Sequence, residues 1–403
     1  MTTLLHNTRL VLPDRVCRGF VVVTDGILSQ VGIGDAPSIE CDNCLDLHDH
    51  YLAPGFVELH THGAGGADFM DGTLDAFETA CNTHLEHGTT TILPTALAAT
   101  KEEILRSIDC FRLAKTALDG KGPYLHGLHM EGPYLNKDQA GAIDPNYIRH
   151  PDPAEYEEFL AYGRGAIARW TVAVEMEGAN RFAERLLEEG ILPSIGHSNA
   201  EYCQVKDAFE HGVTHVTHLY SAMSTIVRRG GFRHSGVLES AFCIPDMTVE
   251  IIADGCHLPA ELLNMVYRVK GVNHVALTCD SMRCAGQNVK TSILGSLENG
   301  QPVLIEDDVA KLMDRSAFAG SIATDDRLIR VMTKQADVPL HEAVYMMTQT
   351  PANIIGLGDK KGSLTVGKDA DLVCFDDDIT VTGVMVGGIG LRGMLSTPKN
   401  LVD

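Results

Sequence analysis

Eight short apolar segments, separated by helical patterns, most constrain what this chain can fold into. Helical patterns such as Lys101–Ala117, Arg181–Glu189, Ala200–His211 and Ala260–Lys270 lie between many of them. Repeated strand–helix alternation predicts an α/β fold with a (β/α)₈ TIM-like barrel rather than an open sheet. The predicted strands are Phe56–His62, Thr89–Leu97, Tyr124–Glu131, Trp170–Glu175, Leu192–His197, His215–Tyr220, Val249–Asp254 and Val275–Asp280.

The two ends of the chain show a different pattern, with short strand-like runs broken by turns. Arg9–Leu12, Phe20–Val23 and Ile27–Val31 lie near the start, and Leu372–Phe375 lies near the end. Runs of this length bounded by Gly and Asp are typical of strands joined by tight turns. We therefore expect residues 1–53 and 359–403 to form one small β-sandwich domain, and residues 54–358 to form the barrel.

Charge and composition exclude several kinds of partner. The net charge of −22 over 403 residues argues against a nucleic-acid or membrane-surface partner, because both need a basic face. No apolar run reaches the length of roughly 18 residues that a membrane span needs. The N-terminus lacks a signal-peptide pattern. The eleven cysteines are scattered, which suits free thiols in a reducing cytoplasm. We expect a cytoplasmic protein.

Polar residues are placed at the carboxyl ends of the predicted strands. The chemistry of a (β/α)₈ barrel lies at that end, and a packed core alone does not need polar residues there. Their coincidence at successive strand ends predicts an active site. The residues are His60, His62, Glu131, His197, His218, Asp254 and Asp280.

These residue types suit a hydrolytic metal centre. His60 and His62 share one face of a strand and could hold one divalent ion, although a pair of structural histidines explains the same spacing almost as well. Glu131, His197 and His218 would leave an open coordination position for water, as catalytic sites do. Taken singly, each has a structural alternative, such as a surface turn or a buried histidine.

Two further residues and one basic cluster complete the candidate site. Asp280 would act as general base towards a metal-activated water and then as acid to the leaving group, unless it is a plain helix cap. His257 could orient the substrate or simply begin a helix. The segment Arg228–His234 is the densest positive patch of an acidic chain. It predicts a phosphate or carboxylate clamp, with a solvated loop as the alternative.

These residues resemble the N-acetylglucosamine-6-phosphate deacetylase family of the amidohydrolase superfamily over essentially the whole chain. The tail Lys361–Val373 is shared across the wider superfamily, whereas the ordered combination of the other segments is specific. The segments that carry the resemblance are Pro54–Gly63, Leu128–Pro133, Gly196–Ala200, Thr217–Met223, Ala253–His257, Thr278–Asp280 and Phe318–Ser321.

The resemblance implies a homodimer of barrel subunits that removes acetate from an amino-sugar phosphate. Glu131, His197 and His218 would be the primary metal ligands, Asp280 the catalytic acid/base, and His257 the substrate-orienting residue. One or two ions are expected per subunit, Zn²⁺ or else Fe²⁺, with the second at His60 and His62. Arg229, or Arg228 beside it, would reach phosphate in the neighbouring site. Implied substrate contacts are Ala142, Ile143, Ser221, Ala222, Arg228, Arg229, His257, Phe318, Ala319 and Gly320.

Three departures from the family pattern border the substrate. Ile143 replaces a histidine, Ser221 an asparagine, and Arg228–Arg233 a Gly-Arg-Glu-Pro-Gly loop. They leave the sugar epimer open, so N-acetylgalactosamine 6-phosphate is an alternative substrate. A cyclic amidase or dipeptidase is a second alternative, weakened because Trp170–Glu175 lacks the lysine that many of those enzymes use. A non-catalytic sugar-phosphate binder is a third, which loss of a ligand would have favoured.

Overall fold

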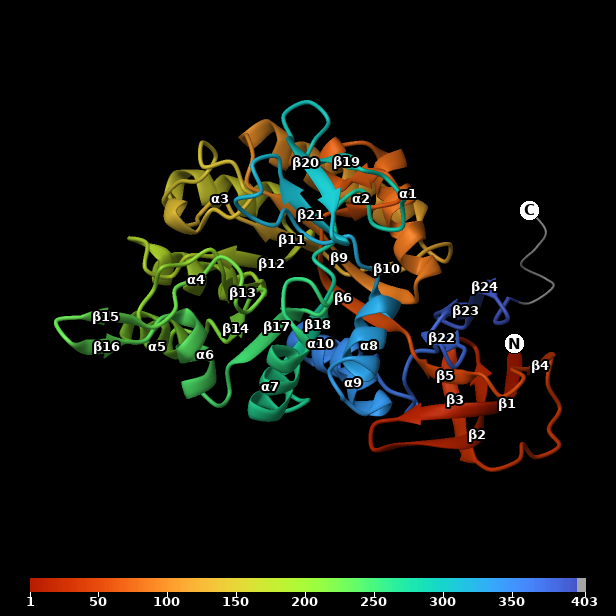
Figure 1. Ribbon diagram of the computed structural model, residues 1–403. Coiled ribbons are helices and arrows are strands. Elements are labelled where there is room, and N and C mark those ends of the chain that lie inside the picture. The colour runs from red at the N-terminus through yellow and green to blue at the C-terminus, as the bar shows by residue number, and fades with distance from the viewer. Residues whose placement is uncertain (397–403) are drawn as a thin grey trace.

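The (β/α)₈ barrel is confirmed by the computed structural model, which describes residues 1–396 (Figure 1). Neighbouring strands are parallel and follow one another in the order of the sequence, as a barrel of this type requires. The eight strands are β6 (Phe56–Thr61), β9 (Thr89–Leu97), β11 (Leu128–Glu131), β12 (Ile167–Val172), β13 (Leu192–Ile195), β14 (His215–Val216), β17 (Thr248–Ile252) and β18 (Val275–Thr278).

Contacts between β6 and β18 bring the first and last strands of the barrel together. The amide of Asp280 donates to the carbonyl of His60 at 3.0 Å, and the amide of His62 donates to Ser281 O at 2.8 Å. The Glu58 carboxylate accepts a hydrogen bond from the Cys279 amide at 2.9 Å. Glu58 is fully buried at this seam, so the acid that opens the His60–His62 motif holds strands together.

Several strands end earlier than the apolar runs predict. The run Tyr124–Glu131 divides into β10 (Tyr124–Leu125) and β11, and the fourth strand begins at Ile167 and ends at Val172. The run His215–Tyr220 keeps only two strand residues. The fourth and sixth strands stop pairing before the polar residues Glu175 and His218 that follow them.

Ten α-helices are described within residues 1–396. Two of them, Lys101–Ala117 and Ala260–Lys270, have the bounds that the sequence predicts. The longest, α2, begins with a capping box in which Thr100 and Glu103 each accept the other's backbone N–H. The helices are α1 (Leu74–Glu86), α2 (Lys101–Ala117), α3 (Pro153–Tyr162), α4 (Ala179–Glu188), α5 (Tyr202–Glu210), α6 (Val237–Cys243), α7 (Ala260–Lys270), α8 (Asp325–Lys334), α9 (Leu340–Met347) and α10 (Gln349–Ile354).

Both ends of the chain contribute strands to a single, mostly antiparallel sheet, which lies to the lower right of the barrel in Figure 1. The antiparallel pair β5–β22 joins the two ends, and Asp25–Gly26 forms the predicted turn with both residues at positive φ. The strands are β1 (Thr2–Leu12), β2 (Arg15–Thr24), β3 (Ile27–Ile33), β4 (Asn43–Asp46), β5 (Tyr51–Pro54), β22 (Leu372–Phe375), β23 (Val381–Val386) and β24 (Ile389–Gly393).

Two insertions in the barrel were not anticipated as strands. A three-stranded sheet of β19 (Thr291–Leu294), β20 (Gln301–Glu306) and β21 (Val309–Leu312) follows β18 and lies beside the barrel mouth (Figure 1). A hairpin of β15 (Val227–Arg229) and β16 (Phe232–His234) projects from the barrel. Within residues 1–396 no helix is both long and apolar enough to cross a membrane.

Candidate metal centre and active site

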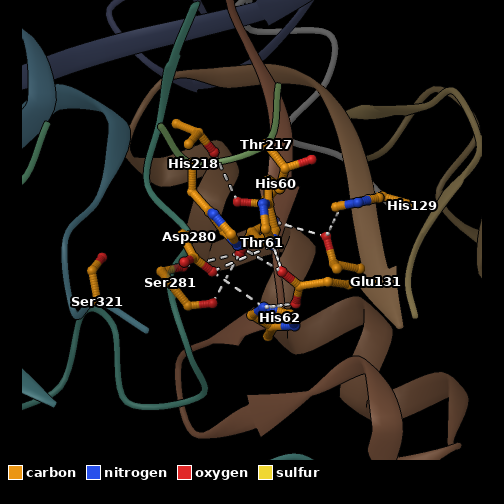
Figure 2. Close-up of polar contacts among 12 residues, drawn as sticks. His60, Thr61, His62, His129, Glu131, Thr217, His218, Asp280, Ser281 and Ser321 are labelled. Carbon is orange, nitrogen blue, oxygen red and sulfur yellow. Dashed lines mark hydrogen bonds and ion pairs between the residues drawn. The ribbon is translucent and has the colours of Figure 1, made fainter. Parts of the chain in front are cut away.

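The polar residues predicted at the strand ends converge on one place. Figure 2 shows His60, His62, Glu131, His218 and Asp280 pointing towards one another. They come from β6, β11 and the turns that follow other barrel strands, and all are buried. The expected meeting of strand ends at the carboxyl face of the barrel is therefore observed.

Three of these side chains depend on an uncommon backbone conformation. His197, His218 and Asp280 each lie two residues beyond the end of a strand, and their φ angles are 47°, 31° and 44°. Residues other than glycine rarely adopt positive φ, and such strained positions cluster at functional sites. The left-handed turn ends each strand and directs the following side chain across the barrel mouth.

A first group of metal-ligating atoms consists of Glu131, His197 and His218. Oε1 of Glu131 lies 3.1 Å from Nε2 of each histidine, and the two Nε2 atoms are 3.1 Å apart. Nδ1 of His197 lies 2.7 Å from Gln139 O, a carbonyl that can only accept. His197 therefore carries its proton on Nδ1 and presents a bare Nε2 to the centre, as a metal ligand must.

A second group consists of His60, His62 and Asp280. Oδ1 of Asp280 lies 3.2 Å from Nε2 of His62 and 3.4 Å from Nε2 of His60. His60 Nε2 and Asp280 Oδ1 are buried and have no hydrogen-bond partner. Buried polar atoms are rarely left unpaired. These facing atoms, with nitrogen and carboxylate donors, fit a divalent ion such as zinc.

Glu131 lies between the two groups. Its Oε1 is 3.4 Å from His60 Nε2 and its Oε2 is 3.3 Å from His62 Nε2, in addition to its contacts in the first group. Burial would lower the pKa of His62, but the facing carboxylates of Asp280 and Glu131 raise it to about 9. The two carboxylates thus make this buried centre favourable for a cation.

The centre forms one side of a cavity of about 210 Å³. Ser221, Ala222 and Gly320 line it as expected, as do Ala142 and Ile143, whereas Ala319 is fully buried and does not. Among the described residues that line it, none is a lysine or an arginine. The apolar part of the lining consists of Leu97, Ala142, Ile143, Ile252, Leu294, Ala317 and Phe318.

His257 also lines this cavity, and Asp254 fixes the orientation of its ring. Its Nδ1 lies 2.8 Å from Oδ2 of Asp254, whose Oδ1 accepts the His257 backbone N–H at 2.8 Å. The other ring nitrogen is left available to a ligand, and the Phe318 ring packs edge-on at a centroid distance of 4.9 Å. Asp254, predicted only as a polar strand-end residue, thereby orients His257.

The predicted phosphate arginines lie outside this cavity. Arg228 and Arg229 belong to the exposed strand β15, at the left edge of Figure 1, and Arg229 pairs with Glu201 of the same chain. Neither arginine lines the pocket of its own subunit.

Sequence reasoning missed a charged pair beneath the centre. Arg169 of β12 and Glu250 of β17 are fully buried, and Nη1 of Arg169 donates to Oε2 of Glu250 at 2.6 Å. The other Glu250 oxygen, Oε1, contacts Nδ1 of His60. Arg169 and Glu250 sit inside apolar strand patterns and are far apart in the sequence, so nothing in either segment signals the pairing. His129 contacts the hydroxyls of Thr95 and Thr171.

A third buried group, of His84, Cys279 and Asp325, lies near the seam of the barrel. His84 contacts the Thr61 hydroxyl at 2.9 Å and Asp325 accepts from Thr89 at 2.5 Å, while Nδ1 of His84 and Oδ1 of Asp325 are buried without a hydrogen-bond partner. This group lines no part of the cavity.

Comparison with known proteins places the chain among hydrolases. Residues 51–390 match the model of the Amidohydrolase family. The N-acetylglucosamine-6-phosphate deacetylase of Haemophilus influenzae is 32% identical over 93% of this chain and 95% of its own length. That of Bacillus subtilis is 30% identical, with 94% of each chain covered.

A solved structure shows the same similarity in three dimensions. It is an aspartate-to-alanine mutant of the Mycobacterium smegmatis deacetylase in complex with N-acetyl-D-glucosamine-6-phosphate. It superposes with a TM-score of 0.87 at 29% identity and covers 97% of this chain and 99% of its own. The family match, the relatives and the strand-end ligands agree: this chain belongs to the amidohydrolase family.

Proposed function

We propose that this protein is a metal-dependent hydrolase that converts N-acetylglucosamine 6-phosphate to glucosamine 6-phosphate and acetate. One observation carries the proposal: Glu131, His197 and His218 meet at the base of a cavity that Asp280 and His257 also line. Relatives at 30% and 32% identity bear the name of this activity. All the ligands are present, which disfavours a non-catalytic binder.

Glu131, His197 and His218 would hold one ion, and His60 and His62 a second, with Glu131 shared between them. A divalent ion supplies Lewis-acid chemistry there, polarising the amide carbonyl and lowering the pKa of a water molecule. The imidazole and carboxylate donors fit zinc best and ferrous iron second. All eleven cysteines are free thiols, which suits the cytoplasmic location expected from the sequence.

Asp280 is the proposed proton carrier. It would take the proton of the attacking water and pass it to the nitrogen of the departing sugar amine. His257, whose Nδ1 donates to Asp254, would orient the substrate through Nε2, which can accept a hydrogen bond from a substrate N–H or O–H group. Together they supply the acid–base and orienting functions that amide hydrolysis needs.

The phosphate would be bound by a second copy of the chain. The cavity offers no lysine or arginine among its described lining residues, while Arg228 and Arg229 project on a hairpin. A guanidinium group binds phosphate bidentately, so one of these arginines from the partner subunit would complete the site. A homodimer is therefore part of the proposal.

Acetate release tests the proposed function. The purified protein is given N-acetylglucosamine 6-phosphate, its galactosamine epimer and unphosphorylated N-acetylglucosamine in parallel. We expect release from the first sugar, and the epimer ratio measures what Ile143 and Ser221 change. Release from none would contradict the proposal and favour a cyclic-amide or dipeptide substrate, although β12 lacks the lysine that many such enzymes use.

A further inference from the structure

We infer that Glu250 is a positioning residue that fixes the tautomer of His60 for the second proposed metal position and also holds the backbone of His218. The inference rests on the metal centre proposed above and adds a residue that touches neither substrate nor ion. Glu250 lies in β17, beneath the centre, and is fully buried.

The two oxygens of the Glu250 carboxylate have different partners. Oε1 lies 2.9 Å from Nδ1 of His60 and accepts the backbone N–H of His218 at 3.2 Å. Oε2 accepts from Nη1 of Arg169 at 2.6 Å. One carboxylate therefore contacts a member of each metal-ligating group and a buried cation.

Arg169 keeps this carboxylate ionised and in place. Its remaining N–H groups donate to Leu59 O at 3.2 Å, to the Ser194 hydroxyl at 3.1 Å and to the Thr217 hydroxyl at 2.8 Å, so the guanidinium is fixed to several strands. The ion pair between Oε2 of Glu250 and Nη1 of Arg169, at 2.6 Å, is buried on both sides.

An ionised carboxylate can only accept hydrogen bonds, and this decides the protonation of His60. Nδ1 must carry the proton that faces Glu250, which leaves Nε2 bare in the neutral ring. Nε2 is the atom that faces Asp280 Oδ1 at 3.4 Å and has no hydrogen-bond partner. Glu250 therefore prepares His60 as a metal ligand, as outer hydrogen-bond partners of metal-binding histidines commonly do.

Glutamine cannot replace this function although it has the same shape. If its carbonyl faces Arg169, its NH₂ group meets the His218 N–H and makes His60 an acceptor at Nδ1, with the proton on Nε2. If it is reversed, the NH₂ group faces the Arg169 guanidinium and leaves a buried charge unpaired. Either arrangement should weaken ion binding at His60, by about 10- to 100-fold for a partner of this kind.

Metal content and histidine NMR test the inference. Wild type, Glu250→Gln and the control Glu103→Gln are stripped and reloaded with Zn²⁺ alone, and bound zinc is measured per subunit. Glu103 is a matched control because its carboxylate is also buried and hydrogen-bonded, accepting from the side chains of Thr100, Ser296 and Asn299. In the zinc-free proteins, ¹⁵N shifts report the tautomer of His60, assigned by its loss in His60→Gln.

We expect Glu250→Gln to lose one of two bound ions and to lose the Nδ1–H form of His60, while Glu103→Gln keeps both ions. Wild-type zinc affinity at both positions with an unchanged tautomer would overturn the inference. If wild type binds fewer than two ions, the proposed two-ion centre is wrong, and the tautomer alone decides the role of Glu250. If Glu250→Gln does not fold, Arg169→Met with Glu250→Met removes the pair together and is read in the same way.

Discussion

The lining of the cavity divides into a group of histidines and carboxylates, which we call the metal side, and a group of apolar residues. The metal side consists of four histidines and two carboxylates that all belong to one chain. Two of the histidines, His60 and His197, are hydrogen-bonded through Nδ1 to Glu250 and to Gln139 O. The rest of the lining is largely apolar and includes Leu97, Ile143, Leu294 and Phe318.

The proposed catalytic residues and the proposed phosphate-binding residues therefore lie in different parts of the molecule. The proposed catalytic groups all belong to one chain, but an anionic sugar entering a protein of net charge −22 needs a local cation. Arg228 and Arg229 are the cations proposed from the sequence, and they lie outside the cavity of their own subunit. Substitutions in the two parts should therefore affect different kinetic constants.

Removal of the catalytic carboxylate on the metal side should have the largest effect. Asp280→Asn keeps the size of the side chain and loses its capacity to take a proton, so we expect kcat to fall by about 10²- to 10⁴-fold. Metal analysis should find ions still bound at Glu131, His197 and His218. Asp75→Asn, on the exposed first turn of α1, is the control. Wild-type turnover in Asp280→Asn would remove this residue from the mechanism.

The two groups of ligands can be separated within the metal side. His60→Gln combined with His62→Asn should lose at most one ion per subunit, because Glu131, His197 and His218 remain within contact of one another. The loss of kcat should be smaller than in Asp280→Asn. Elemental analysis of the reloaded protein measures the change, and the loss of all metal would refute this division of the centre.

Substitution of the proposed phosphate-binding arginines should raise KM. Arg229→Ala removes charge-assisted hydrogen bonds worth about 1.5–3 kcal/mol, which corresponds to a KM for the phosphorylated sugar about 10- to 100-fold higher. The KM for unphosphorylated N-acetylglucosamine should not change. Arg228→Ala is compared directly, and Arg233→Ala in the same hairpin is the control. An equal loss on both sugars would argue against a phosphate contact.

The smallest effect is expected in the apolar part of the lining. Ile143→His adds a polar group to a lining position, and a single hydrogen bond of about 0.5–1.5 kcal/mol changes KM by roughly 2- to 10-fold. Competition between the two sugar 6-phosphate epimers measures the change as a ratio. An unchanged ratio would mean that Ile143 does not contact the part of the sugar at which the epimers differ.

Much of this arrangement could be predicted from the sequence. The apolar runs predicted eight barrel strands, and the rule that barrel chemistry lies at the carboxyl ends brought Glu131, His197, His218 and Asp280 together. These inferences depend on local patterns. Each strand and its end can be identified from a few consecutive residues.

Other features depend on contacts that no local pattern carries. His197, His218 and Asp280 have positive φ where the backbone turns inward after a barrel strand. Histidine and aspartate at these positions do not by themselves predict that conformation. The pairing of Arg169 with Glu250 joins strands that are far apart in the sequence. The β19–β21 sheet was missed because its strands are only four to six residues long.

One measurement tests the division between the two parts most directly. The Asp280→Asn and Arg229→Ala variants are purified separately, mixed in equal amounts, and then unfolded and refolded together. The mixture is assayed for acetate release from N-acetylglucosamine 6-phosphate. If phosphate is bound across a twofold dimer, about half of randomly formed dimers are hybrids with one complete site, so activity should reach about a quarter of the wild-type value. Activity no higher than the mean of the two separate variants would contradict the account, because the phosphate site would then lie within one chain.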